Sequence, residues 1–307
     1  MVLTGIFVGH TAFTITEIMN GLTRSGEDMV STIVWDVRIP RVLVSLLVGG
    51  CLGLSGVLIQ LSTKSPLGDP NLFGIGGGAA VFLAMMAAGI LVFGSLGIVI
   101  GSILCSVFVA LLFSKLISVE NISPIRIAII GIAVGSLTIA LGTSVVSHSR
   151  VFPTQILGLV SGSFTASDWI SVYYLSVTLV ICTISAFLLS RRFYPMILGD
   201  VLSRSLGVNP HSTRTYVMVL AGGLAGVSVY AGGLVGFVGL MSPHIARRIF
   251  GHSPSSMIIG SLWIGSLATI FADQFARLIF APMELPVGMV TTAMGAPIMM
   301  YLALKIR

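Results

Sequence analysis

The charged residues that could do chemistry in this chain gather first in one polar segment. Residues 190–214 read S-R-R-F-Y-P-M-I-L-G-D-V-L-S-R-S-L-G-V-N-P-H-S-T-R and hold four arginines and one carboxylate, that of Asp200. Guanidinium and carboxylate groups form strong, directional ion pairs, so the chemistry available here is that of reversible binding. A short helix-like piece ends at Gly207-Val208-Asn209-Pro210, and the segment is longer than a plain connection needs. We therefore interpret residues 190–214 as a docking element for a partner.

A second group of charged residues comes from two distant parts of the sequence. Arg38-Ile39-Pro40-Arg41 precedes the first long apolar run, and the proline predicts an extended approach to that helix. Its two guanidinium groups either bind a partner or only reach the membrane surface beside their apolar stems. Asp273 and Arg277 have the i,i+4 spacing that pairs opposite charges on one helix face, and Glu284 follows them. Arg277 is also a candidate for contact with a partner.

The sequence lacks the common motifs of catalytic and metal sites. Without a G-x-x-x-x-G-K-[ST] phosphate loop the chain is not expected to hydrolyse ATP, and it has no H-E-x-x-H pattern. We predict no enzyme activity, no cofactor and no bound metal. Cys51, Cys105 and Cys182 are widely spaced in apolar stretches and are predicted to be buried hydrophobic side chains. His244 stands beside two arginines and is interpreted as a polar cap.

The elements that position these residues are membrane helices. Of the 307 residues 55% are hydrophobic and only 8% are charged, and the mean hydropathy is +1.06. A helix needs roughly 20 apolar residues to cross a bilayer. We predict an all-α, polytopic helical bundle that forms a single transmembrane domain over residues 1–307. The predicted spans lie near 41–61, 74–94, 95–117, 125–146, 169–189, 215–234, 236–250, 256–280 and 287–304.

Two parts of this prediction depart from a simple row of spans. Residues 1–9 are apolar but too short to cross, so a first span is expected to be largely missing or only to dip into the membrane. A cleaved signal peptide is not expected, because no basic residues precede this run. The Gly-rich and Pro-broken stretch 232–248 is predicted to contain a short or broken helix.

The distribution of basic residues predicts the orientation. With the C-terminus in the cytoplasm, most of the 16 Lys and Arg residues, including those of residues 190–214, fall on the cytoplasmic side. The sequence pI of about 9.6 then reflects membrane topology and does not indicate nucleic-acid binding. We expect a multi-pass protein of the bacterial cytoplasmic membrane, surrounded by lipid.

Glycine is abundant, with 36 residues, and many lie four positions apart, as Gly222 and Gly226 do. This spacing allows helix backbones to approach closely, so tight packing is the main expectation. Residues 47–56 and 220–229 also resemble each other, and the predicted topology runs them in opposite directions. Such a relationship is typical of transporters with inverted halves.

Several segments together resemble the permease subunits of ATP-driven importers for iron-siderophores, haem and vitamin B12, the type II ABC importers. The resemblance extends from about residue 10 to the end of the chain, in the order found in that family. The segments are R-I-P-R-V-L (38–43), S-P-L-G-D-P (65–70), L-G-D-V-L-S-R-S-L-G-V (198–208), G-F-V-G-L-M-S-P-H-I-A-R (236–247), A-D-Q-F-A-R (272–277) and E-L-P-V-G-M-V-T-T-A-M-G-A-P (284–297).

The resemblance implies an architecture and a set of partners. It implies ten spans per subunit, of which about nine are complete here because the first is truncated or missing. It implies a dimer with a second permease subunit, identical or related, around a central path. Two cytoplasmic ATP-binding subunits would drive transport, and an extracytoplasmic binding lipoprotein or periplasmic protein would deliver the cargo. No chemistry on the cargo is expected.

The resemblance also assigns roles to individual residues. Those implied to couple the chain to the ATPase are Leu198, Gly199, Asp200, Arg204, Leu206, Gly207 and Val208. Those implied to dock the binding protein are Arg38, Arg41 and Arg277, which match outer arginines that meet glutamates in the vitamin B12 member. Those that fall in the family's cytoplasmic gate region, although they match its sequence poorly, are Asn121, Ser123 and Pro124. An aspartate stands at position 200 where the family usually has glutamate, which suggests a particular ATPase partner.

An iron-siderophore complex is the predicted cargo, because it is the commonest cargo of the family, with haem or vitamin B12 as the alternative. The rival class is an ion-coupled secondary transporter. Such a transporter would need an ion-coupling carboxylate near the bilayer midplane, whereas the acidic residues here map near span ends.

Overall fold

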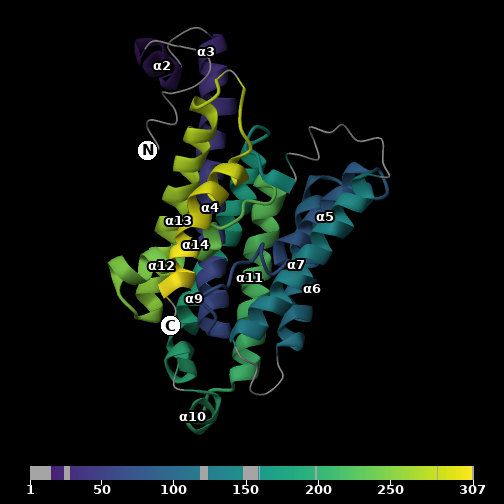
Figure 1. The fold of residues 1–307 in the computed structure, drawn as a ribbon. Helices are drawn as coiled ribbons and strands as arrows, with labels where there is room; N and C mark the ends of the chain where they lie inside the picture. The colour runs from purple at the N-terminus through teal and green to yellow at the C-terminus, as the bar shows by residue number, and fades with distance from the viewer. Residues whose placement is uncertain are drawn as a thin grey trace.

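The computed structural model describes residues 15–23, 28–117, 124–147, 158, 160–197, 199–281 and 283–305. Within these ranges the chain is helical and contains no strand, which confirms the predicted all-α fold. The helices form an elongated bundle with α10 at one end and α2 and α3 at the other (Figure 1). Residues 1–14, where the truncated first span was expected, lie outside the described part.

The described elements follow one another along the chain as helices. In order they are α2 (Ile15–Leu22), α3 (Asp28–Thr32), the π-helix η1 (Ile33–Arg38), α4 (Ile39–Thr63), α5 (Ile75–Ala87), α6 (Ser95–Leu116), α7 (Pro124–Ser147), α9 (Trp169–Ile197), α10 (Asp200–Ser205), α11 (Pro210–Gly232), α12 (Val238–Phe250), α13 (Pro254–Leu278) and α14 (Val287–Lys305).

Among the described residues, six helical stretches are long and apolar enough to cross a membrane, and each contains or closely matches a predicted span. They are Met29–Thr63, Ser95–Leu116, Ile125–Ser147, Trp169–Met196, Pro210–Gly232 and Pro254–Leu278. The predicted span 287–304 corresponds to α14. These helices provide the scaffold on which the shorter elements are held.

Two predicted spans are short helices instead. In place of a span at 74–94 the structure has α5, and in place of one at 236–250 it has α12, each of 13 residues and therefore only about 20 Å long. α5 stops at Ala87, and the chain turns through Gly89 with φ of +72°. α12 begins only at Val238, which agrees with the short or broken helix expected in this Gly-rich stretch.

Pro40 does not mark an extended start to the first long helix, as the sequence had suggested. Arg38 is helical, with φ −75° and ψ −46°, and one continuous helical rod runs through η1 into α4. In the wide π turn the N–H of Ile39 bonds to the carbonyl of Val34, five residues earlier. The same pattern would pair Trp35 with Pro40, which has no N–H, and the Trp35 carbonyl instead accepts a 3.0 Å hydrogen bond from Trp169 Nε1.

α4 runs through the centre of the bundle. Its most apolar stretch is 83% buried, whereas that of α9 is 22% buried, and α4 packs against α9, α11, α12 and α13. Glycine permits this packing, because a Cβ atom on Gly49 would overlap the backbone of Gly265, and one on Gly53 would overlap the backbone of Ser261. The tight packing predicted from glycine spacing is therefore present between α4 and α13.

α11 lies antiparallel to both α4 and α6. Ser55 Oγ of α4 donates a 3.1 Å hydrogen bond to the carbonyl of Ala221, and the end of α4 lies beside the start of α11. The similar segments 47–56 and 220–229 are thus neighbours that run in opposite directions (Figure 1). On α6, Val107 faces Gly222 and Ile103 faces Gly226, so the last turn of α6 lies beside the first turns of α11.

Candidate coupling and docking sites

The polar segment 190–214 is mostly helical. α9 continues through Ile197, because Phe193 and Met196 are buried against the bundle, and α11 already begins at Pro210. The connection between these two helices is therefore much shorter than the loop that the sequence suggested. It consists of the six-residue helix α10 and the residues on either side of it, of which Leu198 lies outside the described part of the chain.

Two glycines set the position of α10. Gly199 has φ of +110° and Gly207 has φ of +79°, conformations that side-chain-bearing residues rarely adopt. Between them, Ser203 Oγ donates to the carbonyls of Pro195 and Gly199, at 2.8 and 2.7 Å, and Val208 N donates to the Ser203 carbonyl at 2.9 Å. α10 is thus folded back onto the end of α9 in a fixed orientation, and it protrudes from the bundle (Figure 1).

Asp200 ties α10 to two long helices. Arg214 Nη2 of α11 lies 3.0 Å from both of its carboxylate oxygens, and Lys64 Nζ at the end of α4 lies 3.7 Å from Oδ1. Arg214 Nε also donates a 3.2 Å hydrogen bond to the carbonyl of Ser62 on α4. The lone carboxylate of the segment therefore makes internal ion pairs, and a displacement of α10 would act directly on α4 and α11.

The outward side of α10 is apolar. Val201, Leu202 and Leu206 are exposed, with Val201 83% exposed, and they lie at the protruding end of the protein. Exposed apolar side chains on such an element indicate contact with another protein. Of the residues predicted to couple, Arg204, Leu206 and Gly207 are exposed, and Asp200 and Val208 are half-buried. Sequence reasoning missed Lys64, which the structure places beside Asp200.

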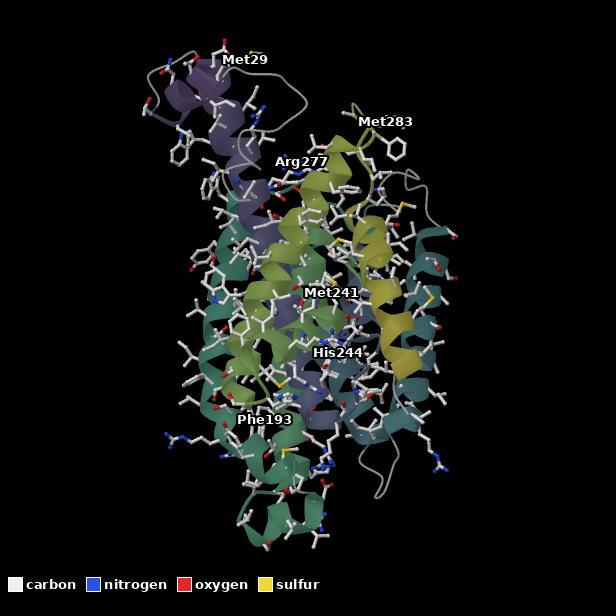
Figure 2. The ribbon with its side chains drawn as sticks, turned by 60° about the vertical axis from the view of Figure 1, so that its left-hand side comes forward. Met29, Phe193, Met241, His244, Arg277 and Met283 are labelled. Atoms are coloured by element: carbon white, nitrogen blue, oxygen red, sulfur yellow. The ribbon has the colours of Figure 1, made fainter. Side chains whose placement is uncertain are left out.

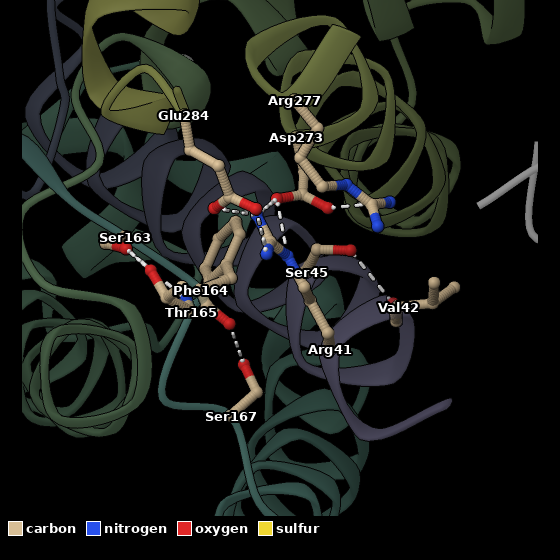
Figure 3. Close-up of polar contacts among 10 residues, drawn as sticks. All are labelled: Arg41, Val42, Ser45, Ser163, Phe164, Thr165, Ser167, Asp273, Arg277 and Glu284. Atoms are coloured by element: carbon tan, nitrogen blue, oxygen red, sulfur yellow. Dashed lines mark hydrogen bonds and ion pairs between the residues drawn. The ribbon is translucent and has the colours of Figure 1, made fainter. Parts of the chain in front are cut away.

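The opposite end of α4 carries a second ion-pair cluster, centred on Arg41 (Figure 3). Arg41 Nε and Nη2 donate to Asp273 Oδ1 at 3.1 and 2.9 Å, and its Nη1 and Nη2 donate to the two Glu284 oxygens at 2.9 and 3.0 Å. Arg277 Nη2 lies 3.2 Å from Asp273 Oδ2, which confirms the predicted i,i+4 pair. The cluster joins α4, α13 and the connection that precedes α14.

The arginines of this cluster are buried. Arg38, Arg41 and Arg277 are only 5%, 7% and 7% exposed, and Asp273 is 1% exposed. Figure 2 shows Arg277 at the end of the bundle that also carries Met29 and Met283. The sequence had placed these guanidinium groups on the surface, either in docking contacts or among lipid headgroups. Packing of α4 against α13 instead encloses Arg41 between two carboxylates.

The turn between α4 and α5 is held against α12. Asp69 is buried and accepts 2.9 Å hydrogen bonds from the N–H groups of Asn71 and Leu72. Burial raises the pKa of Asp69 to about 6, although these N–H donors oppose the shift. His244 Nε2 of α12 lies 3.0 Å from the Pro66 carbonyl, toward the end of the bundle that carries Phe193 (Figure 2). The turn therefore has a structural role.

The environment of His244 favours the neutral imidazole. Burial lowers its pKa most, and the positive charges of Arg247 and Arg248 lower it further, while the hydrogen bond to the Pro66 carbonyl acts in the opposite direction. His244 thus acts as a polar contact between α12 and the turn. Among the described residues no group of three or more His, Cys, Asp or Glu side chains could hold a metal ion.

A cavity of about 550 Å³ opens beside α7 and α14. Its polar lining side chains are Asn71, Ser161 and Thr292, and small or apolar residues supply the rest. Of the predicted gate residues, Asn121 and Ser123 lie outside the described part of the chain, and Pro124 is the first residue of α7. The cavity therefore lies beside the helix that the gate segment leads into.

Comparison with known proteins gives consistent matches over almost the whole chain. A family model described as the FecCD transport family matches residues 1–305. The vitamin B12 import system permease protein BtuC of Klebsiella pneumoniae is 35% identical over 282 residues, covering 89% of this chain and 83% of BtuC. A putative ABC transporter permease protein of Methanocaldococcus jannaschii is 32% identical over 321 residues, covering 97% of this chain and 89% of that protein.

The fold also matches a solved structure. The structure described as an inward-facing conformation of a putative metal-chelate type ABC transporter aligns with a TM-score of 0.83 and 25% identity. The match covers 99% of this chain and 95% of the other chain.

Proposed function

The chain belongs to the FecCD transport family of ABC importer permeases, and on this premise we propose that it carries an iron-siderophore complex across the bacterial cytoplasmic membrane. The family consists of membrane-spanning transport permeases, not enzymes. The observation that carries the transport mechanism in this proposal is α10, a short helix that protrudes from the bundle and is tied through Asp200 to α4 and α11. A permease that receives its energy from separate subunits needs such an element.

The proposed partner of α10 is a cytoplasmic ATP-binding subunit, and two such subunits serve a permease dimer. Val201, Leu202 and Leu206 supply an exposed apolar surface, and Gly199 and Gly207 fix its orientation. Residues 190–214 and the C-terminus then face the cytoplasm, as the distribution of basic residues also favours.

Movement of α10 would reach the far end of the bundle through α4. Asp200 contacts Lys64 at one end of α4, and Arg214 links Asp200 to Ser62 at the same end. Arg41 lies at the other end of α4. The 21 residues from Arg41 to Ser62 span about 32 Å of helix. Because α4 is packed on nearly all sides, it transmits displacement as a rigid element.

The cavity beside α7 and α14 is the proposed cargo path. Its lining of small and apolar side chains, with only a few polar groups, offers weak contacts, which suits a bulky chelate that must enter and leave. A second permease subunit, identical or related, is proposed to close the open side of this cavity.

The cluster around Arg41 is the proposed docking end for an extracytoplasmic binding lipoprotein or periplasmic protein. Arg38, Arg41 and Arg277 gather there, but Arg41 already engages Asp273 and Glu284. Glu284, whose side chain is 22% exposed, is the more accessible of these two carboxylates. A carboxylate on the binding protein would therefore reach Arg41 by displacing Glu284.

A second candidate cargo is vitamin B12, favoured by the 35% identity to the BtuC protein of Klebsiella pneumoniae. The test is reconstitution with candidate ATPase and binding proteins, followed by uptake of labelled ferric siderophores, haem and cobalamin. Accumulation of a ferric siderophore supports the first proposal, and accumulation of cobalamin or haem alone replaces it. Uptake that persists without ATP would contradict the ATP-driven mechanism itself.

A further inference from the structure

A groove with apolar walls and a basic edge lies between α6 and α11, at the end of the bundle that carries α10. Its volume is about 310 Å³. The antiparallel register of the two helices brings the last turn of α6 beside the first turns of α11. The groove is lined by Phe108, Leu111, Leu112, Ser114, Lys115, His211 and Thr215.

The apolar wall lies on the surface of a membrane-spanning helix. Phe108 is 67% exposed and Leu112 is 45% exposed, so this side of α6 is not covered by the described part of the chain. In a bilayer this side of the helix meets lipid hydrocarbon, not water. The wall is therefore suited to a fatty acyl chain, and the groove gives that chain a fixed position.

The edge of the groove is basic. Lys115 is in the last turn of α6 and His211 is in the first turn of α11, and both are exposed. Within the described part of the chain, neither side chain makes a hydrogen bond or an ion pair. The N–H groups of His211 and Ser212 are already capped by the Asn209 side chain, so the side chains, and not the helix end, are available to a ligand.

We propose that this groove binds an anionic phospholipid from the leaflet at the α10 end. Its acyl chain lies along Phe108, Leu111 and Leu112, and its phosphate lies between Lys115 and His211. Each cationic side chain near an anionic membrane surface strengthens the binding of a protein to the anionic lipids about fivefold. A zwitterionic lipid lacks the net charge for the edge, and a free phosphate lacks the chain for the wall.

The bound lipid would add a link between two elements that already pack together in the protein. His211 follows directly after the connection that contains α10, and Lys115 ends the neighbouring helix. An anionic lipid at this place braces the base of α10 against α6. The inference depends on membrane insertion and not on the identity of the cargo, so it can fail or succeed independently of the proposed function.

The test is native mass spectrometry of the full chain, purified in detergent and incubated with phosphatidylglycerol or phosphatidylcholine. We expect retention of phosphatidylglycerol in preference to phosphatidylcholine, and binding at least about fivefold weaker in the variant K115Q/H211Q. The matched control is R191Q/R192Q, which removes two exposed charges from α9 at the same end of the bundle and should retain the lipid.

A second variant tests the wall without changing charge. L112W fills the groove and should also release phosphatidylglycerol, while an unchanged gel-filtration profile shows that the variant is folded. Glycerol phosphate, which has the headgroup but no chain, should not compete. Equal retention of the two lipids, undiminished binding by K115Q/H211Q, an equal loss in the control, or competition by glycerol phosphate would each overturn the proposal.

Discussion

Arg41 donates two hydrogen bonds, from Nε and Nη2, to a single carboxylate oxygen of Asp273, which lies 232 residues further along the chain. The other oxygen of Asp273 contacts Arg277. One buried carboxylate thus lies between two guanidinium groups, and it fastens α4 to α13 at the end opposite α10. Removing one partner of a buried ion pair is costly, because the remaining charge is left without compensation.

We expect Asp273→Asn to destabilise the protein by about 3–5 kcal/mol, since two buried arginines lose their shared negative charge. Thermal unfolding of the purified protein in detergent measures the effect. Asp36→Asn serves as the control, because Asp36 is exposed on the same helical rod as Arg41. Equal melting temperatures for the two variants would show that the cluster contributes nothing to stability.

The pair Asp200–Arg214 is predicted to serve coupling more than stability. It is partly exposed, at 39% and 21%, so its loss should cost only about 0.5–1 kcal/mol. Asp200→Asn and Arg214→Gln should each raise the ATP hydrolysed per cargo molecule in proteoliposomes, and the double variant should be no worse than either, since they break the same link. Additive losses of coupling in the double variant would mean that the two residues act separately. Arg192→Gln provides the control.

Gly207 is predicted to matter through its backbone and through its partner. A Cβ atom there meets no atom of this chain within 4 Å, but the φ of +79° strains any side-chain-bearing residue. In the isolated permease, Gly207→Ala and Gly207→Leu should cost the same, about 1–2 kcal/mol, and Gly207→Asn less. With the ATPase present, a much larger loss of uptake for leucine than for alanine would indicate that the partner occupies this space. Equal loss would place the partner elsewhere.

Adjacent glycines on α11 should respond in opposite ways to alanine. A Cβ atom on Gly222 would lie 2.8 Å from Val107 Cα of α6, whereas one on Gly223 meets nothing within 4 Å. Gly222→Ala should destabilise the bundle by about 1–3 kcal/mol, because the helices must separate. Gly223→Ala should be neutral or stabilising by up to about 1 kcal/mol. Chemical or thermal unfolding in detergent compares them, and a reversed order would disprove the α6–α11 register.

His244 should make stability depend on pH. Its pKa in the folded protein is lowered, mainly by burial, so the unfolded chain binds the proton more readily. The contribution of the neutral ring to the free energy of unfolding is complete above the ordinary histidine pKa of about 6.5 and declines as the pH falls below that value. Asp69, whose pKa is raised to about 6, responds in the opposite sense, so the difference between wild type and His244→Gln isolates the histidine.

As the pH is lowered, the melting temperature of the wild type should fall relative to that of His244→Gln. Glutamine can still donate to the Pro66 carbonyl but does not titrate. Parallel melting curves at all pH values would mean that His244 does not change its charge in this range.

Hydropathy predicted the long helices because a span must be apolar over about 20 residues, and that property is local. It failed for α5, whereas the Gly-rich and Pro-broken pattern of residues 232–248 already indicated a short helix such as α12. The apolar run from residue 74 to 94 contains both a helix and the turn at Gly89, and hydropathy does not separate the two.

The ion pairs show the same division between local and distant information. Asp273 and Arg277 were paired correctly from their spacing, because both lie on one helix. The ion pair between Arg41 and Asp273 depends on the register of α4 relative to α13 along the bundle. Contacts such as that of Gly49 with Gly265 set this register. Spacing along the sequence carries no information about that register.

The proline that follows the π turn gives the end of the protein opposite α10 an intrinsic fluorescence probe. Because Pro40 leaves the Trp35 carbonyl to the indole of Trp169, the two rings stack with centroids 6.5 Å apart. The chain has only three tryptophans, and two of them report on the separation of η1 and α9. Intrinsic fluorescence therefore follows this separation during a transport cycle without any added label.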